Sequence, residues 1–526
     1  MIKLIPEPYR YSLDAGTVNL MKGFSISFPE IWKDEIDDFM DFAHKLSLRS
    51  EKVSLNEINV IADETVEYEG YYIKISDNRI SVRASSKTGC FYAMQSLKQL
   101  TLAYSMRIPC FTIEDKPRFS FRAFMLDVGR YFYSVSDVKK FIDLIALHKL
   151  NFLHLHLTED QGWRVEIKKY PFLTQKSSKR SHTNFNARPH GGFYTQDDVK
   201  EIVAYAHKKH IKVIPEIDMP GHMQAALHAY PELGCFARKL PVATHWGIKH
   251  DILCGGKDEV LAFVKDVIDE ITELFPDGLI HIGGDEAPKT RWQICPRCQA
   301  KIKELGLKNE NELQGHFLSE VGKYISSKGY TAIMWNEDEI SGKSNSDIIW
   351  MAWNVPKENH ANILNEMKNG RYVINGLSEP NYLDLPYAQN TLERIYSESA
   401  DFIEKNDRMI GLEAFLWTEF VPNMDNAFFK TFPRLGAFAE KAWSEEKKLD
   451  YKTFLEKIPS YEELLKIHGV TRFASVKRAN PSKILGFFEK LWWERRQLCW
   501  HGLHNLVDNA KVKKKYSEKK KKEKNR

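Results

Sequence analysis

Short apolar runs separated by amphipathic stretches dominate the chain from about residue 120 onward. Eight of these runs are nearly continuous, and a segment with helical spacing follows most of them. Strands that are buried on both faces read as continuous apolar runs, and strands that alternate with helices form βα units. Eight units in about 300 residues predict a (β/α)8 barrel, with a doubly wound parallel sheet as the alternative. The predicted strands are residues 121–127, 151–157, 212–217, 279–282, 331–335, 347–353, 372–375 and 411–417.

The first 110 residues follow a different pattern. Residues 34–48 and 91–102 have helical spacing, and two strand-like segments, 71–75 and 79–84, flank a polar turn. This arrangement predicts a small α+β unit in front of the barrel. We therefore expect four parts along the chain. They are an α+β domain (1–112), a catalytic barrel (113–450), a helical segment (451–510) and a basic disordered tail (511–526).

Charge and composition exclude several classes of protein. The net charge is +5, but residues 511–526 alone carry ten Lys or Arg and two Glu, so the rest of the chain is slightly acidic. A nucleic-acid-binding fold is therefore not predicted. No run approaches the roughly 20 apolar residues of a membrane span. The first residues lack the apolar core of a secretory signal, and seven cysteines are too few for a disulfide framework, so we expect a cytoplasmic protein.

The helical segment near the C-terminus carries a cluster of aromatic and apolar residues. We expect this cluster to pack against the barrel within one chain, and packing across a homodimer is the alternative. The cluster consists of Phe487, Phe488, Leu491, Trp492, Trp493 and Trp500.

Carboxylates and tryptophans follow the predicted strands. Because barrel enzymes place their sites at the C-terminal ends of the strands, these side chains are expected to share one site. Indole faces stack on the apolar face of a sugar ring and carboxylates accept its hydroxyl groups, so the set favours a neutral polyhydroxylated ligand. The strand-end residues are Asp127, Arg130, His154, His156, Glu159, Asp160, Glu216, Asp218, His222, Asp285, Glu286, Trp335, Asn336, Glu337, Trp353, Tyr382, Asp384, Trp417 and Glu419.

The motif His281-Ile-Gly-Gly-Asp-Glu286 is the most specific of these features. Successive residues of a regular strand face opposite sides, so Asp285 and Glu286 can share a site only where the strand breaks into a loop. The two glycines permit such a break. Adjacent carboxyl groups can then divide their roles, one protonated as an acid and the other ionised.

This motif resembles the signature of glycoside hydrolase family 20, the β-N-acetylhexosaminidases. Further motifs occur in the family's order, and the resemblance covers roughly residues 70–445. These motifs are Asp115-Lys-Pro-Arg-Phe119, Lys149-Leu-Asn-Phe-Leu-His-Leu-His-Leu157, Gln161-Gly-Trp-Arg164, Pro215-Glu-Ile-Asp-Met-Pro-Gly-His222, Tyr382-Leu-Asp384 and Leu416-Trp-Thr-Glu419.

The resemblance implies an exo-acting retaining glycosidase that removes terminal β-linked N-acetylhexosamine. The sugar's own 2-acetamido oxygen would attack the anomeric carbon and form an oxazolinium intermediate, so no protein nucleophile is needed. By the family pattern, Glu286 is the general acid and base, Asp285 orients the acetamido group, and Tyr382 donates a hydrogen bond to its oxygen. No organic cofactor or catalytic metal is implied. The resemblance leaves the preference between GlcNAc and GalNAc open.

The remaining site residues are expected to bind the sugar. By the family pattern, the tryptophans wall the acetamide pocket, the charged groups bind the hydroxyl groups, and His222 with Asp218 orients Glu286 or its neighbours. Trp350 competes with Trp353 for one position, and Glu159 stands where the family often has Asp. The expected binding residues are Arg130, Asp160, His222, Trp335, Trp353, Asp384, Trp417 and Glu419.

Four other interpretations compete with this one. His154 and His156 share one face of a strand, as ligands in metal-dependent hydrolases do, although hydrogen-bonded interior histidines are the simpler interpretation. Cys295 and Cys298 form a lone Cys-x-x-Cys pair, which marks a structural helix start unless a metal or redox partner completes it. A non-catalytic sugar-binding barrel would be expected to lack the acid Glu286. A conventional glycosidase would need a second acid roughly 5–9.5 Å from Glu286.

Overall fold

The computed structural model describes residues 2–501, apart from 185–186, 338–346, 357–359 and 402–403, together with Lys514. The rest of the predicted basic tail and the side chain of Trp500 lie outside the described residues. Within that part of the chain, none of the helices is long and apolar enough to cross a membrane.

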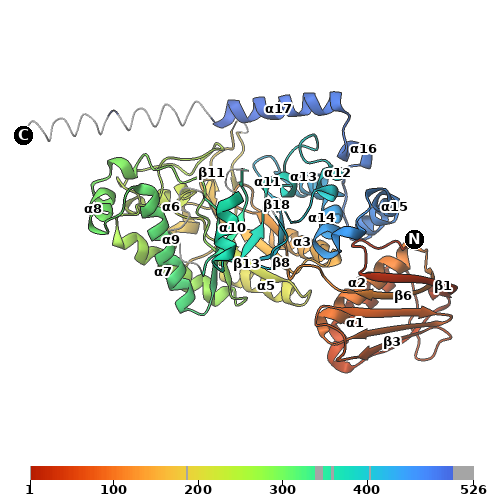
Figure 1. Cartoon of the computed structure of the whole chain (residues 1–526). Helices are drawn as coiled ribbons and strands as arrows, with labels where there is room; N and C mark the ends of the chain where they lie inside the picture. The colour runs from red at the N-terminus through yellow and green to blue at the C-terminus, as the bar shows by residue number, and fades with distance from the viewer. Residues whose placement is uncertain are drawn as a thin grey trace, which may run out of the picture.

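The N-terminal unit is a six-stranded sheet with two helices packed on it (Figure 1). The predicted pair of strands forms β4 (Tyr71–Ser76) and β5 (Arg79–Ala84), which pair antiparallel around the turn at Asn78. The two predicted helices are α1 (Lys33–Lys45) and α2 (Lys87–Ala103). The other strands are β1 (Arg10–Asn19), β2 (Ser25–Ser27), β3 (Glu57–Ala62) and β6 (Arg107–Asp115), in the sheet order β1-β6-β4-β5-β3-β2.

Eight parallel strands close into a barrel, which confirms the predicted fold. Each predicted run overlaps one strand, and most of the strand residues are buried because helices cover the outside and side chains fill the inside. The strands are β7 (Phe121–Asp127), β8 (Phe152–His156), β13 (Lys212–Glu216), β14 (Leu279–His281), β15 (Thr331–Trp335), β16 (Ile349–Ala352), β17 (Val373–Asn375) and β18 (Met409–Leu416).

Amphipathic helices surround the barrel, as Figure 1 shows. Two of them begin with a capping box, in which Ser134 pairs with Asp137 and Thr195 pairs with Asp198. The helices that follow the strands include α3 (Val135–Leu147), α5 (Gln196–His207), α7 (Asp258–Leu274), α9 (Glu310–Ser327), α10 (His360–Lys368), α12 (Leu392–Ser397) and α14 (Arg434–Trp443).

A buried ion pair joins the N-terminal sheet to the barrel. The ammonium of Lys149, just before β8, lies 2.8 Å from Oδ2 of Asp115 at the end of β6. The hydroxyl of Tyr71 accepts a hydrogen bond from the same ammonium, and the indole of Trp443 donates to Asp115 Oδ1. Asp115 and Lys149 are at most 2% exposed, so the two units share a polar contact that water does not reach.

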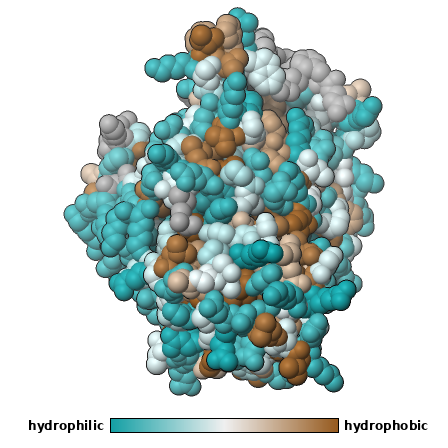
Figure 2. Space-filling model, turned by 90° about the vertical axis from the view of Figure 1, so that its right-hand side faces the viewer, coloured by the Kyte–Doolittle hydropathy of each residue, from teal (hydrophilic) through white to brown (hydrophobic). Residues whose placement is uncertain are grey.

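The C-terminal segment is helical, and three residues of its aromatic cluster are exposed. It forms α15 (Tyr451–Ile467), which packs on α2, then α16 (Val476–Ala479) and α17 (Lys483–His501). Trp493 of the predicted aromatic cluster packs on the barrel, with its ring 4.9 Å from that of Phe420. Phe487, Phe488 and Trp492 are 57–63% exposed, because α17 contacts the barrel mainly through one side. Figure 2 shows apolar side chains at the top of the molecule, where Figure 1 places α17.

Candidate active site

A cavity of about 940 Å³ opens at the C-terminal ends of the barrel strands. This is the expected position of a site in a barrel of this type. Its walls combine carboxylates, one arginine, one histidine and several aromatic rings. The predicted residues on the wall are Arg130, His222, Asp285, Glu286, Trp353, Tyr382, Asp384, Trp417 and Glu419.

The chain breaks after β14 in the way that the Gly-Gly pair predicts. Gly283 and Gly284 have φ values of +65° and +106°, and a Cβ on Gly283 would lie 1.7 Å from Asp218 Oδ1. Glycine is therefore required at 283 on both steric and conformational grounds. The break turns Asp285 and Glu286 into the same cavity. Glu286 itself has a φ of +44°, an uncommon conformation for a residue with a side chain.

His222 lies between the predicted catalytic carboxylates and a second acidic group. Its Nε2 is 3.6 Å from Glu286 Oε2 and 3.8 Å from Asp285 Oδ2, while its Nδ1 is 2.8 Å from Glu159 Oε1. The Glu159 and Asp218 carboxylates raise the pKa of His222 well above its usual range, although burial opposes them. The imidazole is therefore a cation at neutral pH.

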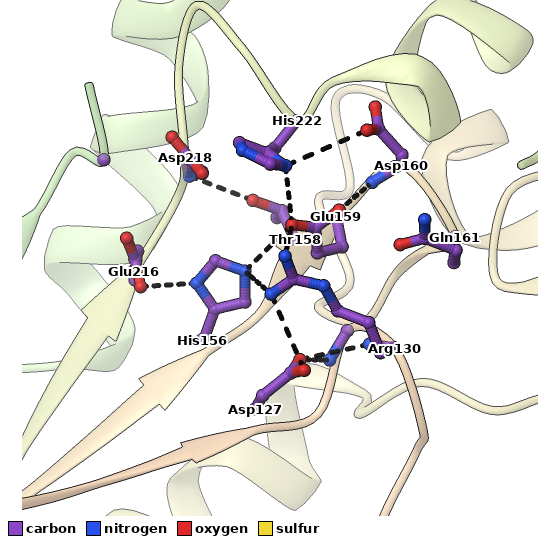
Figure 3. Close-up of polar contacts among 12 residues, drawn as sticks. Asp127, Arg130, His156, Thr158, Glu159, Asp160, Gln161, Glu216, Asp218 and His222 are labelled. Carbon is purple, nitrogen blue, oxygen red and sulfur yellow. Dashed lines mark hydrogen bonds and ion pairs between the residues drawn. The ribbon is translucent and has the colours of Figure 1, made fainter. Parts of the chain in front are cut away.

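Glu159 is the centre of the network in Figure 3. The guanidinium of Arg130 lies 2.5 Å from Glu159 Oε1, and His156 and His222 approach the same carboxylate. Burial acts to raise the pKa of Glu159, but the Arg130 and His222 cations outweigh it and hold the pKa well below the usual value. Glu159 therefore stays ionised and fixes both cations beside the cavity.

In the free protein the pKa of Asp285 is raised and that of Glu286, the predicted acid, is lowered, whereas the reaction needs the proton on Glu286. Burial raises the pKa of Asp285 to about 6, and the charge of Glu286 adds to the effect. Burial also acts to raise the pKa of Glu286, but the hydrogen bond and positive charge of His222 outweigh it and lower the pKa. At a pH between the two pKa values, Asp285 and Glu286 together hold one proton, and in the free protein this proton is mainly on Asp285.

The opposite wall comes from the last two strands. Tyr382 follows β17 and pairs by a parallel bridge with Phe415 of β18, and its ring lies 6.0 Å from that of Trp417. Asp384 accepts a hydrogen bond from the Trp417 backbone N–H at 3.4 Å. Burial and the nearby Glu419 carboxylate raise the pKa of Asp384 to about 7. Glu419 lies 3.8 Å from the guanidinium of Arg130, which also contacts Glu159, so Arg130 connects this wall to the Glu159 network.

The structure distinguishes between the two candidate tryptophans, Trp350 in β16 and Trp353 in the loop after it. Trp353 lines the cavity, and its buried indole Nε1 has no hydrogen-bond partner among the described residues. Trp350 is 1% exposed, and the Arg371 guanidinium covers its ring at 4.5 Å. Trp353 is therefore the one available to a ligand.

Two predicted binding residues lie behind the wall and not on it. Trp335 is 1% exposed; its indole donates to Glu216 and its ring lies 5.9 Å from that of Trp417. Asp160 accepts a hydrogen bond from the Gln224 N–H and lies 3.8 Å from His222 Nδ1. In this structure Trp335 contacts the wall residue Trp417, and Asp160 contacts the wall residue His222, but neither lines the cavity itself.

Several wall residues were not predicted from the sequence. Gln161 follows β8, and Trp246 and Ile248 come from the insertion after β13. Trp493 and Glu494 come from α17. Of these wall residues, Gln161 had a signal in the sequence, because it opens the motif Gln161-Gly-Trp-Arg164. Glu337, which was predicted from its position after a strand, is not part of this wall; burial raises its pKa to about 8, and it accepts a hydrogen bond from the Glu286 N–H at 3.3 Å.

The paired histidines of β8 are engaged with carboxylates inside the barrel. His154 lies 2.7 Å from Glu413 Oε1 and 3.1 Å from Glu216 Oε2, and His156 hydrogen-bonds to Glu216. His281 lies 2.9 Å from the other oxygen of Glu216. This agrees with hydrogen-bonded interior histidines, which orient one another and the Trp335 indole.

The closed barrel and its acidic, aromatic pocket define a (β/α)8 protein with a site suited to a polyhydroxylated ligand. Residues 119–446 match the family described as "Glycosyl hydrolase family 20, catalytic domain", and residues 1–116 match "Glycosyl hydrolase family 20, domain 2". The chain belongs to glycosyl hydrolase family 20.

Named relatives agree with this assignment. A β-hexosaminidase of Porphyromonas gingivalis is 39% identical over 428 residues, covering 76% of this chain and 54% of the relative, so the chain spans about half the length of that protein. A β-hexosaminidase of Akkermansia muciniphila is 33% identical over 418 residues, covering 76% of this chain and 84% of the relative.

Solved structures are similar over nearly the whole chain. The β-N-acetylhexosaminidase from Bacteroides fragilis has a TM-score of 0.79 at 33% identity, covering 91% of this chain and 99% of that chain. A family 20 exo-β-N-acetylglucosaminidase from Vibrio harveyi, solved with N-acetylglucosamine, has a TM-score of 0.80 at 28% identity, covering 90% and 78%.

Proposed function

We propose that the protein is an exo-acting β-N-acetylhexosaminidase that retains the anomeric configuration by substrate-assisted catalysis. One observation carries the proposal. Asp285, Glu286 and Tyr382 all face one cavity, although Asp285 and Glu286 follow β14 and Tyr382 follows β17, on another part of the barrel. The family membership and the names of the relatives support it.

Glu286 is the general acid and base. It protonates the leaving oxygen and then takes a proton from the incoming water, help that is typically worth about 10²–10⁴-fold. Its carboxyl group is the more exposed of the pair, at 37% against 14% for Asp285. This exposure suits a group that must meet both an aglycone and water.

Asp285 and Tyr382 hold the acetamido group. Asp285 Oδ1 is buried and has no hydrogen-bond partner among the described residues, so it is free to accept the acetamido N–H. Accepting that N–H favours the ionised form of Asp285, which places the shared proton on Glu286, where the reaction needs it. The Tyr382 hydroxyl, with a pKa raised by burial, stays protonated and donates to the acetamido oxygen.

The rest of the wall holds a terminal sugar. Arg130, Glu419 and Asp384 contact the hydroxyl groups far from the bond that is cleaved, and Trp417 and Trp353 pack on the ring and the acetamide. Arg130 is held by Glu159 and lies with its guanidinium carbon 4.7 Å from the centre of the Trp417 ring. Because charged groups close this end of the cavity, a sugar chain enters only by its non-reducing end.

The products of a short β-linked N-acetylglucosamine oligomer test this proposal. The protein should release the monosaccharide first, one unit at a time, and the sugar should appear as the β-anomer in proton NMR before it mutarotates. Release of internal fragments would contradict exo action. First appearance of the α-anomer would contradict retention.

A further inference from the structure

Four cysteines from three separate segments converge at one point outside the sugar pocket. They are Cys235, Cys254, Cys295 and Cys298, and their sulfur atoms all lie within 4.8 Å of one another. The Sγ–Sγ distances are 3.5 Å for 254–298, 3.8 Å for 254–295 and 3.9 Å for 235–298. The four residues carry free thiols in this structure.

These distances match a tetrahedral metal site. Structural zinc sites hold four ligands tetrahedrally with Zn–S bonds of about 2.3 Å, which places the sulfur atoms about 3.8 Å apart. A disulfide bond is only about 2.05 Å long. The Cys295-Pro-Arg-Cys298 pair, which the sequence left without a partner, therefore has its second half in Cys235 and Cys254.

The local backbone is built to bring the two halves together. Gly234 pairs with Leu253 by an antiparallel bridge, and the Cys254 N–H donates to the Leu233 carbonyl at 3.0 Å, so the segments that carry Cys235 and Cys254 run next to each other. A Cβ on Gly256 would lie 2.4 Å from the backbone nitrogen of Cys298, so glycine permits the close approach of the two segments.

The other pair opens a helix. Cys295 is the N-cap residue of α8 (Pro296–Glu304), and Cys298 lies in the first turn. The positive end of the helix dipole favours thiolates at these positions. The nearby cations have other partners: Lys257 donates to two backbone carbonyls, and Arg297 pairs with Glu259.

Three of the four thiols are buried, so thiolates formed from them would need a cation to balance their negative charge. Cys254, Cys295 and Cys298 are at most 1% exposed, and a buried charge is costly without a partner. A soft thiolate set selects zinc among the common divalent ions. Coordination requires each thiol to lose its proton, and no oxidant or reductant is needed.

We propose that Cys235, Cys254, Cys295 and Cys298 bind one structural Zn²⁺. The ion would join the insertion after β13 to the segment that follows Asp285 and Glu286. The insertion carries Trp246 and Ile248, which line the sugar cavity, and Trp292 just before α8 donates its indole N–H to Leu253 at 2.9 Å. The site therefore holds one wall of the cavity against the catalytic loop.

Metal analysis of the full-length protein tests the site directly. After purification without chelators and dialysis, elemental analysis by mass spectrometry should find one zinc per chain. The Cys298→Ser and Cys235→Ser variants should lose most of it. Cys110→Ser is the matched control, because Cys110 lies in β6, away from the cluster, and this variant should keep its zinc.

A second measurement on the unaltered protein covers the case in which the variants do not fold. Titration of the thiols with an organomercurial should release zinc into a colorimetric chelator as the cluster thiols react. Cobalt substituted for zinc should show the visible absorption of a tetrahedral tetrathiolate complex. Lowering the pH should release the ion, because the thiolates regain their protons.

Three results would overturn the proposal. A metal-free protein with four free cluster thiols would show that the convergence is only packing. A mass lower by four hydrogens under non-reducing conditions, without metal, would show two disulfide bonds. Iron in place of zinc would show that the site selects a redox metal.

Discussion

The Nε2 atom of His222 lies 3.6 Å from Oε2 of Glu286. This contact connects the protonation of the proposed acid to a cation that Glu159 and Asp218 keep charged. It lowers the pKa of Glu286, and the same cation also acts to lower that of Asp285. In the proposed mechanism, the Asp285–Glu286 pair is active when it holds one proton.

The His222 contact predicts the basic limb of the pH profile. The pair loses its last proton as the pH rises through about 6, the pKa of Asp285, so kcat/KM should fall above that pH. His222→Gln removes the cation that lowers both pKa values, so the fall should move to higher pH. Profiles of kcat/KM for both proteins measure this, with His228→Gln in α6 (Gln224–Ala229) as the control. An unmoved limb would refute the role of His222.

Asp285→Asn should move the same limb in the opposite direction. Glu286 is then the remaining carboxyl of the pair, and its lowered pKa should place the limb at lower pH. Losing the charge that stabilises the oxazolinium should also reduce kcat by about 10²–10³-fold. Glu337→Gln is the matched control, because a carboxyl with a pKa of about 8 is already neutral at pH 7. Equal effects of the two changes would contradict the assignment.

The buried pair between the two domains should contribute strongly to stability. Asp115→Asn leaves the Lys149 ammonium buried without a counter-charge, which typically costs about 3–5 kcal/mol in the free energy of unfolding. Denaturant titration measures the loss. Asp14→Asn breaks an exposed pair with Lys74 at 3.0 Å and should change stability little. A small loss for Asp115→Asn would mean that the junction relaxes and admits water.

The wall contributed by α17 should bind the aglycone side of the substrate. Trp493 is 7% exposed and lines the cavity, whereas its neighbour Trp492 is 57% exposed. Trp493→Ala should raise KM for a β-linked oligomer by about tenfold, the effect expected when an aromatic contact worth about 1.4 kcal/mol is lost. Trp492→Ala should leave KM within error of the unaltered protein. Similar KM values for both variants would place the aglycone elsewhere.

The barrel was predictable because its strands are buried on both faces, and such strands appear in the sequence as continuous apolar runs. Residues 331–335 form an apolar run and coincide with β15. The Gly-Gly break after His281 was predictable for a similar local reason. In the helical segment at the C-terminus, the predicted packing of the aromatic cluster on the barrel is seen for Trp493 but not for the exposed Phe487 and Phe488, because apolar content does not say which side of a helix contacts the barrel.

The remaining wall residues could not be predicted, because they converge only in the folded chain. Trp246 lies in an irregular insertion, and Trp493 lies some two hundred residues after the catalytic loop. Cys235 and Cys254 have no metal-ligand spacing, and the backbone contacts between residues 233–234 and 253–254 that bring their segments together form only in the folded chain. For Asp160 and Trp335, the sequence predicted the neighbourhood but not which side chains reach the cavity.

Hydrolysis of two matched substrates tests whether the acetamido group of the sugar is the nucleophile. The 4-nitrophenyl β-glycosides of N-acetylglucosamine and of glucose differ only at C2, where the first carries the acetamido nucleophile. The account predicts cleavage of the acetamido sugar alone, and a strong loss of that activity in Glu286→Gln. Equal cleavage of the plain glucoside would contradict it, because a nucleophile from the protein would then be required.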